Sequence, residues 1–300
     1  MRFVWRIPTA QALTDLMPSP SPLDPRLTPA RPDLAAASLR GKVAAARFVE
    51  GRRRRVVEPI ASLRRAPAHD APLETQALHG EDVLVFEENE GWAWAQLQRD
   101  SYVGYAPANA LGAETAPTHR VAVLSTFVYP KPNIKAPPLM ALPLGARVEV
   151  KASEGDFHAA EGGFIYARHL APLDQFEPDF VAVAERFLEA PYLWGGRTAQ
   201  GVDCSGLVQN ALAAAGRAAP RDTDMQEAGL GSAVGFDEGL RGLERGDLVF
   251  WKGHVGVMRD ETTLLHASGW HMRVVSEPLA AARDRIVGQG GGPITSIRRL

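Results

Sequence analysis

The spacing of apolar residues changes near residue 175 of this 300-residue chain, and this change constrains the fold more than any other feature. From about 61 to 173, short alternating apolar stretches are separated by Gly and Pro, which is typical of small β modules. Beyond 175, Phe180, Val183, Ala184 and Phe187 follow the spacing of one helix face. The sequence therefore predicts β modules followed by a domain that begins with helices.

A weak internal repeat divides the β region in two. The stretch 80–85 (GEDVLV) recurs as 145–150 (GARVEV), with Val at the same two positions after Gly. Repeated units of about 50 to 55 residues fit two SH3-like barrels. We expect these barrels at 61–115 and 116–173.

The first 60 residues are predicted to form an N-terminal arm. The stretch 17–32 holds six prolines, so it should be extended, and 33–49 is predicted as one short helix. Polar residues and Pro interrupt every apolar run near the N-terminus, and no run of about 18 apolar residues occurs anywhere. The expected location is therefore the cytoplasm.

The C-terminal region, 175–300, is predicted to be an α+β domain. A second helix should begin at Cys204, with Asp203 as its N-cap and Gly216 as its stop. Four strands are expected after it, at 247–251, 254–258, 262–268 and 273–277.

Charge and cysteine content exclude several classes of protein. One cysteine in 300 residues allows no intramolecular disulfide. The net charge of −2 gives no global field that would recruit nucleic acid or an anionic membrane, so neither partner is expected. The four arginines at 52–55 are interpreted as a solvated basic face rather than a binding patch.

The single cysteine lies where a nucleophile would lie. Cys204 opens a helix, where unpaired backbone N–H groups favour the thiolate and can receive an oxyanion. A lone cysteine is otherwise a small buried apolar residue, but such a residue would lie within the apolar stripe of the helix. We therefore expect a thiol pKa below the ~8.5 of a free cysteine.

Two histidines lie on consecutive predicted strands. If Met258 pairs with Thr262, then His254 lies directly opposite His266. His254 is then the base that takes the thiol proton, and His266 orients it. A zinc site of one Cys and two His is the alternative, but no His-x-x-x-His, Cys-x-x-Cys or Glu-based motif accompanies them. No metal or cofactor is expected.

Four segments in order resemble the NlpC/P60 cysteine peptidases, which act on cell-wall peptides. The segments are 191–196 (PYLWGG), 203–207 (DCSGL), 245–250 (RGDLVF) with 254–257 (HVGV), and 265–267 (LHA). The resemblance covers roughly 178–285 and implies a papain-like α+β fold with Cys204, His254 and His266 as the catalytic triad. It also implies that the Tyr192 hydroxyl lies near the oxyanion or substrate.

Two SH3-like modules ahead of such a domain resemble the dipeptidyl-peptidase VI branch of the family. That branch cleaves the γ-D-glutamyl–diamino acid bond of free peptides that begin with L-Ala, in murein peptide recycling. The resemblance implies that Asp203 and Ser205 bind the substrate amine together with a Glu and a Tyr of the first module, for which we choose Glu74 and Tyr102. Small peptidoglycan-derived peptides are the expected partners. The alternatives are a hydrolase of intact peptidoglycan stems, a non-catalytic wall-peptide binding protein and an acyltransferase.

Overall fold

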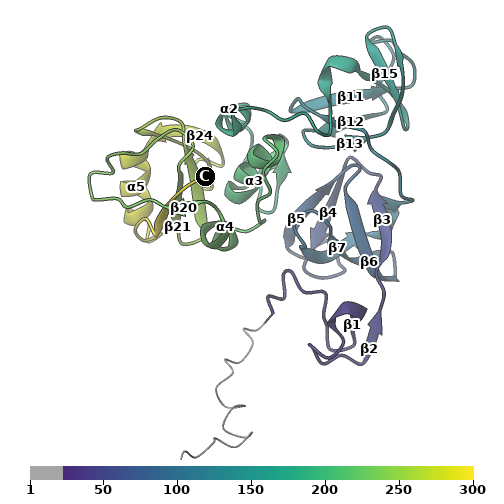
Figure 1. Cartoon of the computed structure of the whole chain (residues 1–300), viewed down its shortest axis with the longest axis horizontal. Helices are drawn as coiled ribbons and strands as arrows, with labels where there is room; N and C mark the ends of the chain where they lie inside the picture. The colour runs from purple at the N-terminus through teal and green to yellow at the C-terminus, as the bar shows by residue number, and fades with distance from the viewer. Residues whose placement is uncertain (1–22) are drawn as a thin grey trace, which may run out of the picture.

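A computed structural model describes residues 23–300, which form an N-terminal segment, two β units and a C-terminal α+β domain (Figure 1). Residues 17–22 of the predicted extended arm lie outside the described residues. No helix among the described residues is long and apolar enough to span a lipid bilayer.

The predicted helix at 33–49 is wrong. This stretch forms strand β1 (Leu34–Ala36), a 3-10 turn η1 (Ala37–Leu39) and strand β2 (Arg47–Val49), and β1 pairs with β2 in parallel. Gly41 has a φ of 80°, which interrupts any helix through this stretch. The alanines that favour a helix are instead buried in β1, so tertiary packing overrides local propensity.

The first β unit is a seven-stranded sheet in the order β5-β4-β8-β7-β6-β3-β9. Its elements are β3 (Arg52–Val56), β4 (Ile60–Arg64), β5 (Leu73–Leu78), β6 (Asp82–Asn89), β7 (Trp92–Leu97), β8 (Val103–Pro107), η2 (Ala108–Ala110) and β9 (Leu111–Gly112). The sheet thus begins at Arg52, ahead of the expected boundary at 61. The arginine run is strand β3, and only part of it is a solvated face, since Arg55 is buried and bonds Asp82.

The second β unit consists of a five-stranded sheet, β12-β11-β16-β15-β14, and a three-stranded sheet, β13-β10-β17. Its elements are β10 (His119–Val121), β11 (Ser125–Tyr129), β12 (Met140–Pro143), β13 (Arg147–Val148), β14 (Val150–Glu154), β15 (Phe157–Ala160), β16 (Gly163–Tyr166), η3 (Ala167–His169) and β17 (Leu170–Pro172). A small apolar core that includes Val121, Val128 and Ile165 holds the two sheets together.

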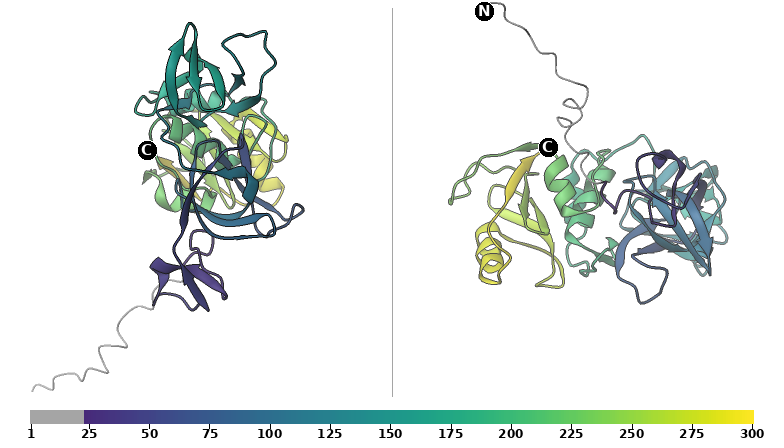
Figure 2. Two further views of the ribbon diagram at one scale, coloured as in Figure 1. Left: turned by 90° about the vertical axis from the view of Figure 1, so that its right-hand side faces the viewer. Right: turned by 90° about the horizontal axis from the view of Figure 1, so that it is seen from below.

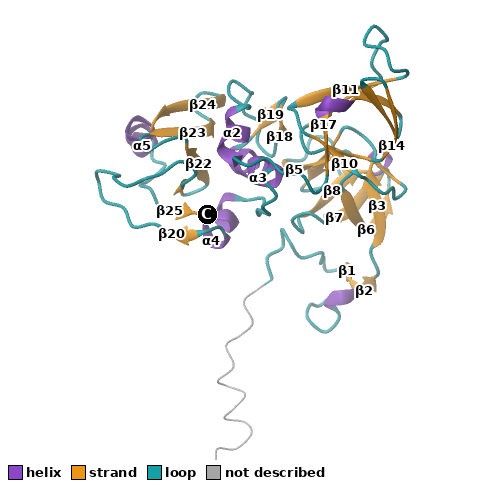
Figure 3. Cartoon of the chain, turned by 45° about the horizontal axis from the view of Figure 1, so that its top comes forward, coloured by secondary structure: helices purple, strands orange, loops and turns teal. Residues whose placement is uncertain are grey.

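The C-terminal domain has a six-stranded sheet in the order β20-β25-β21-β22-β23-β24 (Figure 3). Its elements are α2 (Phe180–Glu185), β18 (Arg197–Thr198), β19 (Gly201–Val202), α3 (Cys204–Ala214), α4 (Thr223–Gly229), β20 (Ser232–Ala233), β21 (Leu248–Trp251), β22 (His254–Met258), β23 (Thr263–Ser268), β24 (Arg273–Pro278), α5 (Leu279–Gly288) and β25 (Ser296–Arg299). The helix start at Cys204 and all four expected strands are confirmed, within one residue at each end. Helices α4 and α5 and strand β25 were not anticipated.

Two apolar cores cover the two faces of this sheet. Helices α2 and α3 pack on one face, through residues such as Val183, Leu207 and Val208 against Phe250 and Val255. Helix α5 covers the other face. Figure 2 shows the green segment that carries α3 lying between the yellow sheet and the first β unit. Helix α3 therefore joins the C-terminal sheet to the first β unit, where its Gln209 donates to Asp100 at 2.9 Å.

Buried polar contacts join the first β unit to the C-terminal domain. Arg197 is fully buried and donates to the Gln76 carbonyl at 2.5 Å and to Glu81 at 3.0 and 3.1 Å. Arg221 donates to the Thr75 hydroxyl at 2.8 Å. Charge-assisted bonds of this kind fix orientation as well as contact, so the two units are held in one arrangement.

Candidate active site

Cys204 opens α3 as predicted, and Asp203 is the N-cap. The Asp203 carboxylate accepts a hydrogen bond from the Gly206 N–H at 2.7 Å, which satisfies one unpaired donor of the helix start. The Cys204 Sγ lies 3.8 Å from the Thr223 hydroxyl. Hydrogen bonding from the backbone N–H groups of Val255 and Ser205 lowers the pKa of this thiol. Because Val255 directly follows His254, the thiol lies beside the strand that carries the predicted base.

The resting thiol is not as acidic as expected. Burial, and secondly the Asp203 carboxylate, raise the pKa of Cys204 to about 11, and the Thr223 hydroxyl and backbone N–H groups offset this only in part. The helix N-terminus favours the thiolate, but the cost of burying the charge outweighs it. Burial likewise lowers the pKa of His254 to about 3. The resting site therefore holds a neutral thiol and a neutral imidazole.

The two histidines meet, although their predicted register is wrong. Met258 pairs with Leu264 rather than Thr262, because the turn is two residues longer than assumed. A shift of two residues keeps every side chain on the same face of the sheet. His254 Nε2 therefore still lies 2.7 Å from His266 Nδ1. Gly256 makes room for this approach, since a Cβ there would lie 3.2 Å from the Cβ of His266.

Two charged residues that the sequence analysis missed continue from His266. His266 Nε2 lies 2.8 Å from Glu277 Oε1, and Arg285 binds both oxygens of Glu277 at 2.5 and 2.7 Å. Burial alone would raise the pKa of Glu277, but the bonds from His266 and Arg285 outweigh it and lower this pKa to about 2. The β23–β24 pairing would have revealed Glu277: His266 lies opposite Val275, and a residue two positions along shares its face.

A buried arginine binds both carboxylate oxygens of Asp203. Arg221 is 1% exposed and donates to both Asp203 oxygens, at 2.6 and 3.0 Å. It also donates to the Ser205 hydroxyl at 2.8 Å. The Gly195 N–H donates to Asp203 as well, at 2.8 Å. Asp203 and Ser205 thus line the site as expected, but their bonding capacity is largely taken, and their role as amine ligands stays a prediction.

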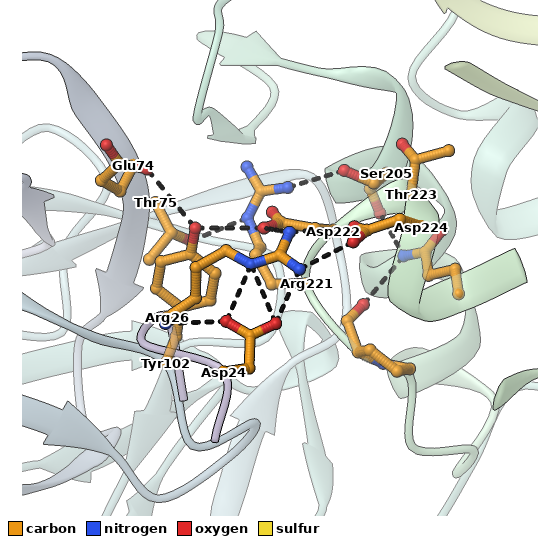
Figure 4. A network of polar contacts seen from close by, with 12 residues as sticks. Asp24, Arg26, Glu74, Thr75, Tyr102, Ser205, Arg221, Asp222, Thr223 and Asp224 are labelled. Carbon is orange, nitrogen blue, oxygen red and sulfur yellow. Dashed lines mark hydrogen bonds and ion pairs between the residues drawn. The ribbon is translucent and has the colours of Figure 1, made fainter. Parts of the chain in front are cut away.

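Glu74 and Tyr102 come from the first β unit and reach the same pocket (Figure 4). The Tyr102 hydroxyl lies 3.1 Å from Asp222 Oδ2 and 3.4 Å from Glu74 Oε2. Arg65 forms an ion pair with Glu74. Asp222 is a further carboxylate that the sequence analysis missed. It lies between Arg221 and Thr223 in the sequence.

The N-terminal segment completes this network. Arg26 Nη1 donates to Asp222 at 2.8 Å, and its other guanidinium nitrogens bond Asp24 and Asp224. Burial raises the pKa of Asp222, and the charges of Arg221 and Arg26 oppose that rise. Burial also raises the pKa of the Tyr102 hydroxyl, which therefore stays protonated and can donate.

One pocket of about 330 Å³ joins these groups. It is lined by Arg26, Arg65, Glu74, Tyr102, Tyr192, Trp194, Asp203, Cys204, Ser205, Asp222, Thr223, Asp224 and Gly253. Six of the eight predicted site residues are among them; His254 and His266 are not, and they line a separate cavity with Trp251, Ser268 and Arg285. Burial raises the pKa of the Tyr192 hydroxyl, with the nearby Cys204 and Asp203 adding to the effect, so this group also stays a donor. Within 23–300, no three His, Cys, Asp or Glu side chains are grouped to hold a metal ion.

Comparison with known proteins identifies the first β unit and the C-terminal domain. Residues 189–287 match the NlpC/P60 family, and residues 63–111 match the bacterial dipeptidyl-peptidase SH3 domain. Dipeptidyl-peptidase 6 of Lysinibacillus sphaericus is 25% identical over 239 residues, which cover 71% of this chain and 86% of that protein. The gamma-D-glutamyl-L-lysine dipeptidyl-peptidase of Bacillus subtilis (strain 168) is 30% identical over 227 residues, which cover 66% of this chain and 73% of that protein.

A solved structure agrees with the fold. The crystal structure of an NlpC/P60 family protein from Bacillus cereus aligns with a TM-score of 0.69 at 20% identity, over 83% of this chain and 99% of that chain. From these matches, we conclude that the chain belongs to the NlpC/P60 family of cysteine peptidases and carries an SH3 domain ahead of its catalytic domain.

Proposed function

We propose that this peptidase hydrolyses the γ-D-glutamyl–diamino acid bond of small cell-wall peptides whose N-terminal L-Ala carries a free amine. The names of its relatives, dipeptidyl-peptidase 6 and gamma-D-glutamyl-L-lysine dipeptidyl-peptidase, support this substrate class. The observation that carries the proposal is the acidic end of the pocket, where Tyr102 lies between Glu74 and Asp222.

The charge of the pocket favours a cationic end group. Its network contains five carboxylates (Asp24, Glu74, Asp203, Asp222 and Asp224) and three guanidinium groups (Arg26, Arg65 and Arg221), a formal charge of −2. An α-ammonium offsets part of this charge and supplies three donors. A neutral, acylated nitrogen would leave this net negative charge without a compensating cation, and losing one partner of a buried charge pair costs roughly 2–5 kcal/mol in comparable truncations.

The proposed reaction uses Cys204 as nucleophile and His254 as base. The thiol gives its proton to His254 as sulfur attacks the γ-carbonyl carbon, and a thioester forms when the diamino acid leaves with the proton. The backbone N–H of Cys204 and the Tyr192 hydroxyl are the proposed donors to the oxyanion. Water then hydrolyses the thioester, with His254 again as the base.

Three further points belong to this proposal. The second β unit is a second SH3-like barrel, which would make the domain order arm, two barrels and peptidase. We also propose that the enzyme acts in the cytoplasm, in murein peptide recycling. Small peptides are its partners, and neither nucleic acid nor membrane is.

The test compares L-Ala-γ-D-Glu-diamino acid tripeptide with its N-acetylated copy. We expect kcat/KM to be about 30- to 5,000-fold higher for the free amine, which corresponds to 2–5 kcal/mol. Glu74→Gln should reduce this preference through KM. The control is Glu88→Gln, on the same β unit and paired with Arg52 and Arg54 instead. Equal kcat/KM for the two peptides would favour the alternative, a hydrolase of intact peptidoglycan stems, in which the alanine nitrogen is acylated.

A further inference from the structure

Four side chains form a hydrogen-bonded line that runs from the active site to α5. His254 Nε2 and His266 Nδ1 are 2.7 Å apart, His266 Nε2 and Glu277 Oε1 are 2.8 Å apart, and Arg285 binds Glu277 through two nitrogens. We propose that Glu277, held by Arg285, is the positioning residue that fixes where the protons lie on both histidines. The inference rests on the proposed roles of Cys204, His254 and His266.

Proton positions along this line follow from the carboxylate. An ionised Glu277 can only accept, so His266 Nε2 must carry a hydrogen. A neutral His266 then has a bare Nδ1, which can only accept from His254 Nε2–H. His254 is left with a bare Nδ1, the nitrogen that a general base needs. One charge thus determines the tautomers of two rings.

Arg285 keeps Glu277 in the required state. Its two bonds to the carboxylate lock the rotamer, and the Glu277 pKa of about 2 keeps the group ionised at every pH where a peptidase of this kind would work. His271 Nε2 also lies 3.6 Å from Glu277 Oε1. A structural ion pair between Glu277 on β24 and Arg285 on α5 would not require that His266 and Arg285 both bind Glu277 Oε1.

The same arrangement serves the reaction. When the Cys204 proton moves to His254 Nδ1, the ring becomes an imidazolium, and its Nε2–H remains bonded to His266. The Glu277 charge raises the pKa of His254, but the opposing effect of Arg285 is larger, so Glu277 serves this step by holding the tautomer and not by stabilising the cation. Glu277 is therefore expected to act on kcat rather than on KM, because it does not line the pocket.

A spectroscopic experiment tests the proton positions without substrate. In 15N-histidine-labelled protein at pH 7, we expect His254 and His266 to be neutral and in the Nε2–H tautomer. Glu277→Ala should give a mixture of tautomers at His266, and Glu277→Gln an intermediate result, since an amide can either accept or donate. The control is Glu189→Gln. This change removes the surface partner of Arg273, which lies on β24, the strand that also carries Glu277. Unchanged tautomers in Glu277→Ala would overturn the inference.

Kinetics supply the second measurement. Glu277→Ala and Glu277→Gln should lower kcat by about 10- to 100-fold, the usual cost of removing a group that orients a functional histidine, with little change in KM. Glu277→Gln keeps the size of the side chain and remains informative if the alanine variant fails to fold. A kcat within about twofold of wild type in a folded variant would refute the positioning role. Absence of cleavage in the wild type would instead refute the proposed substrate and leave the tautomer result intact.

Discussion

Replacing Arg26 with Gln should shift the pH dependence of substrate binding, although Arg26 is far from Cys204 in sequence. Arg26 donates to Asp222 at 2.8 Å, and Asp222 is the carboxylate that the Tyr102 hydroxyl also contacts. Burial raises the pKa of Asp222, and Arg26 is one of the charges that hold it down. Removing the guanidinium should therefore raise this pKa further, so that Asp222 becomes neutral at a higher pH than in the wild type.

The size of the effect can be worked from the pair. The Arg26 side chain is 34% exposed and that of Asp222 is 24% exposed, so solvent screens this ion pair. Partly exposed pairs of this kind contribute about 0.2–1 kcal/mol. If only ionised Asp222 binds the substrate amine, KM at a pH below both pKa values should rise by about 1.4- to 5-fold.

Measurement of KM and kcat for the free tripeptide between about pH 4.5 and 8 tests this reasoning. For Arg26→Gln, we expect KM to begin rising at a higher pH than in the wild type as the pH falls and to reach values up to about fivefold higher, with kcat largely retained. Arg283→Gln is a matched control, because Arg283 is 31% exposed and pairs with Asp284 on α5 instead. A KM profile for Arg26→Gln that superimposes on that of the wild type would refute the role assigned to Arg26.

Four further predictions concern the reacting groups and their support. Cys204→Ala should remove activity by about 10⁴- to 10⁶-fold with the thermal transition retained, and a residual rate within about tenfold of wild type would contradict its role as nucleophile. His266→Asn should keep more activity than His266→Ala, because an amide can still hold the His254 ring, and equal kcat values would argue against that role. Because Asp203 raises the pKa of Cys204, Asp203→Asn should move iodoacetamide alkylation of the thiol to lower pH, and an unchanged midpoint would contradict the electrostatic argument. Arg221→Met should lower the free energy of unfolding by about 3–5 kcal/mol in urea titrations, since it leaves Asp203 buried without its partner, and a loss under about 1 kcal/mol would contradict this.

Local signals carried the sequence predictions that succeeded. Asp203 followed by an apolar stripe predicts a helix start, and α3 begins at Cys204. The two strands that bear His254 and His266 were also found from alternation alone. Their register was wrong by two residues, yet the histidines still meet because side chains repeat with a period of two.

Long-range partners were the part that local patterns could not supply. Arg221 contacts Thr75 and Asp203, and nothing near Arg221 in the sequence indicates either neighbour. The predicted helix at 33–49 was wrong for the same reason. Its alanines favour a helix in isolation, but they are buried in β1, which forms only because Arg47 and its neighbours return beside it.

The bond between Arg26 and Asp222 joins positions 196 residues apart, so the N-terminal segment and the C-terminal domain must both be present before the acidic end of the pocket exists. During synthesis, Arg26 leaves the ribosome long before its carboxylate partner. If the proposed function holds, a chain that lacks either partner would lose the selectivity for a free amine even where Cys204 is intact. Recombination that exchanged only the peptidase domain would likewise separate Arg26 from Asp222. The acidic end of the pocket is therefore inherited intact only when the N-terminal segment, the first β unit and the peptidase domain are inherited together.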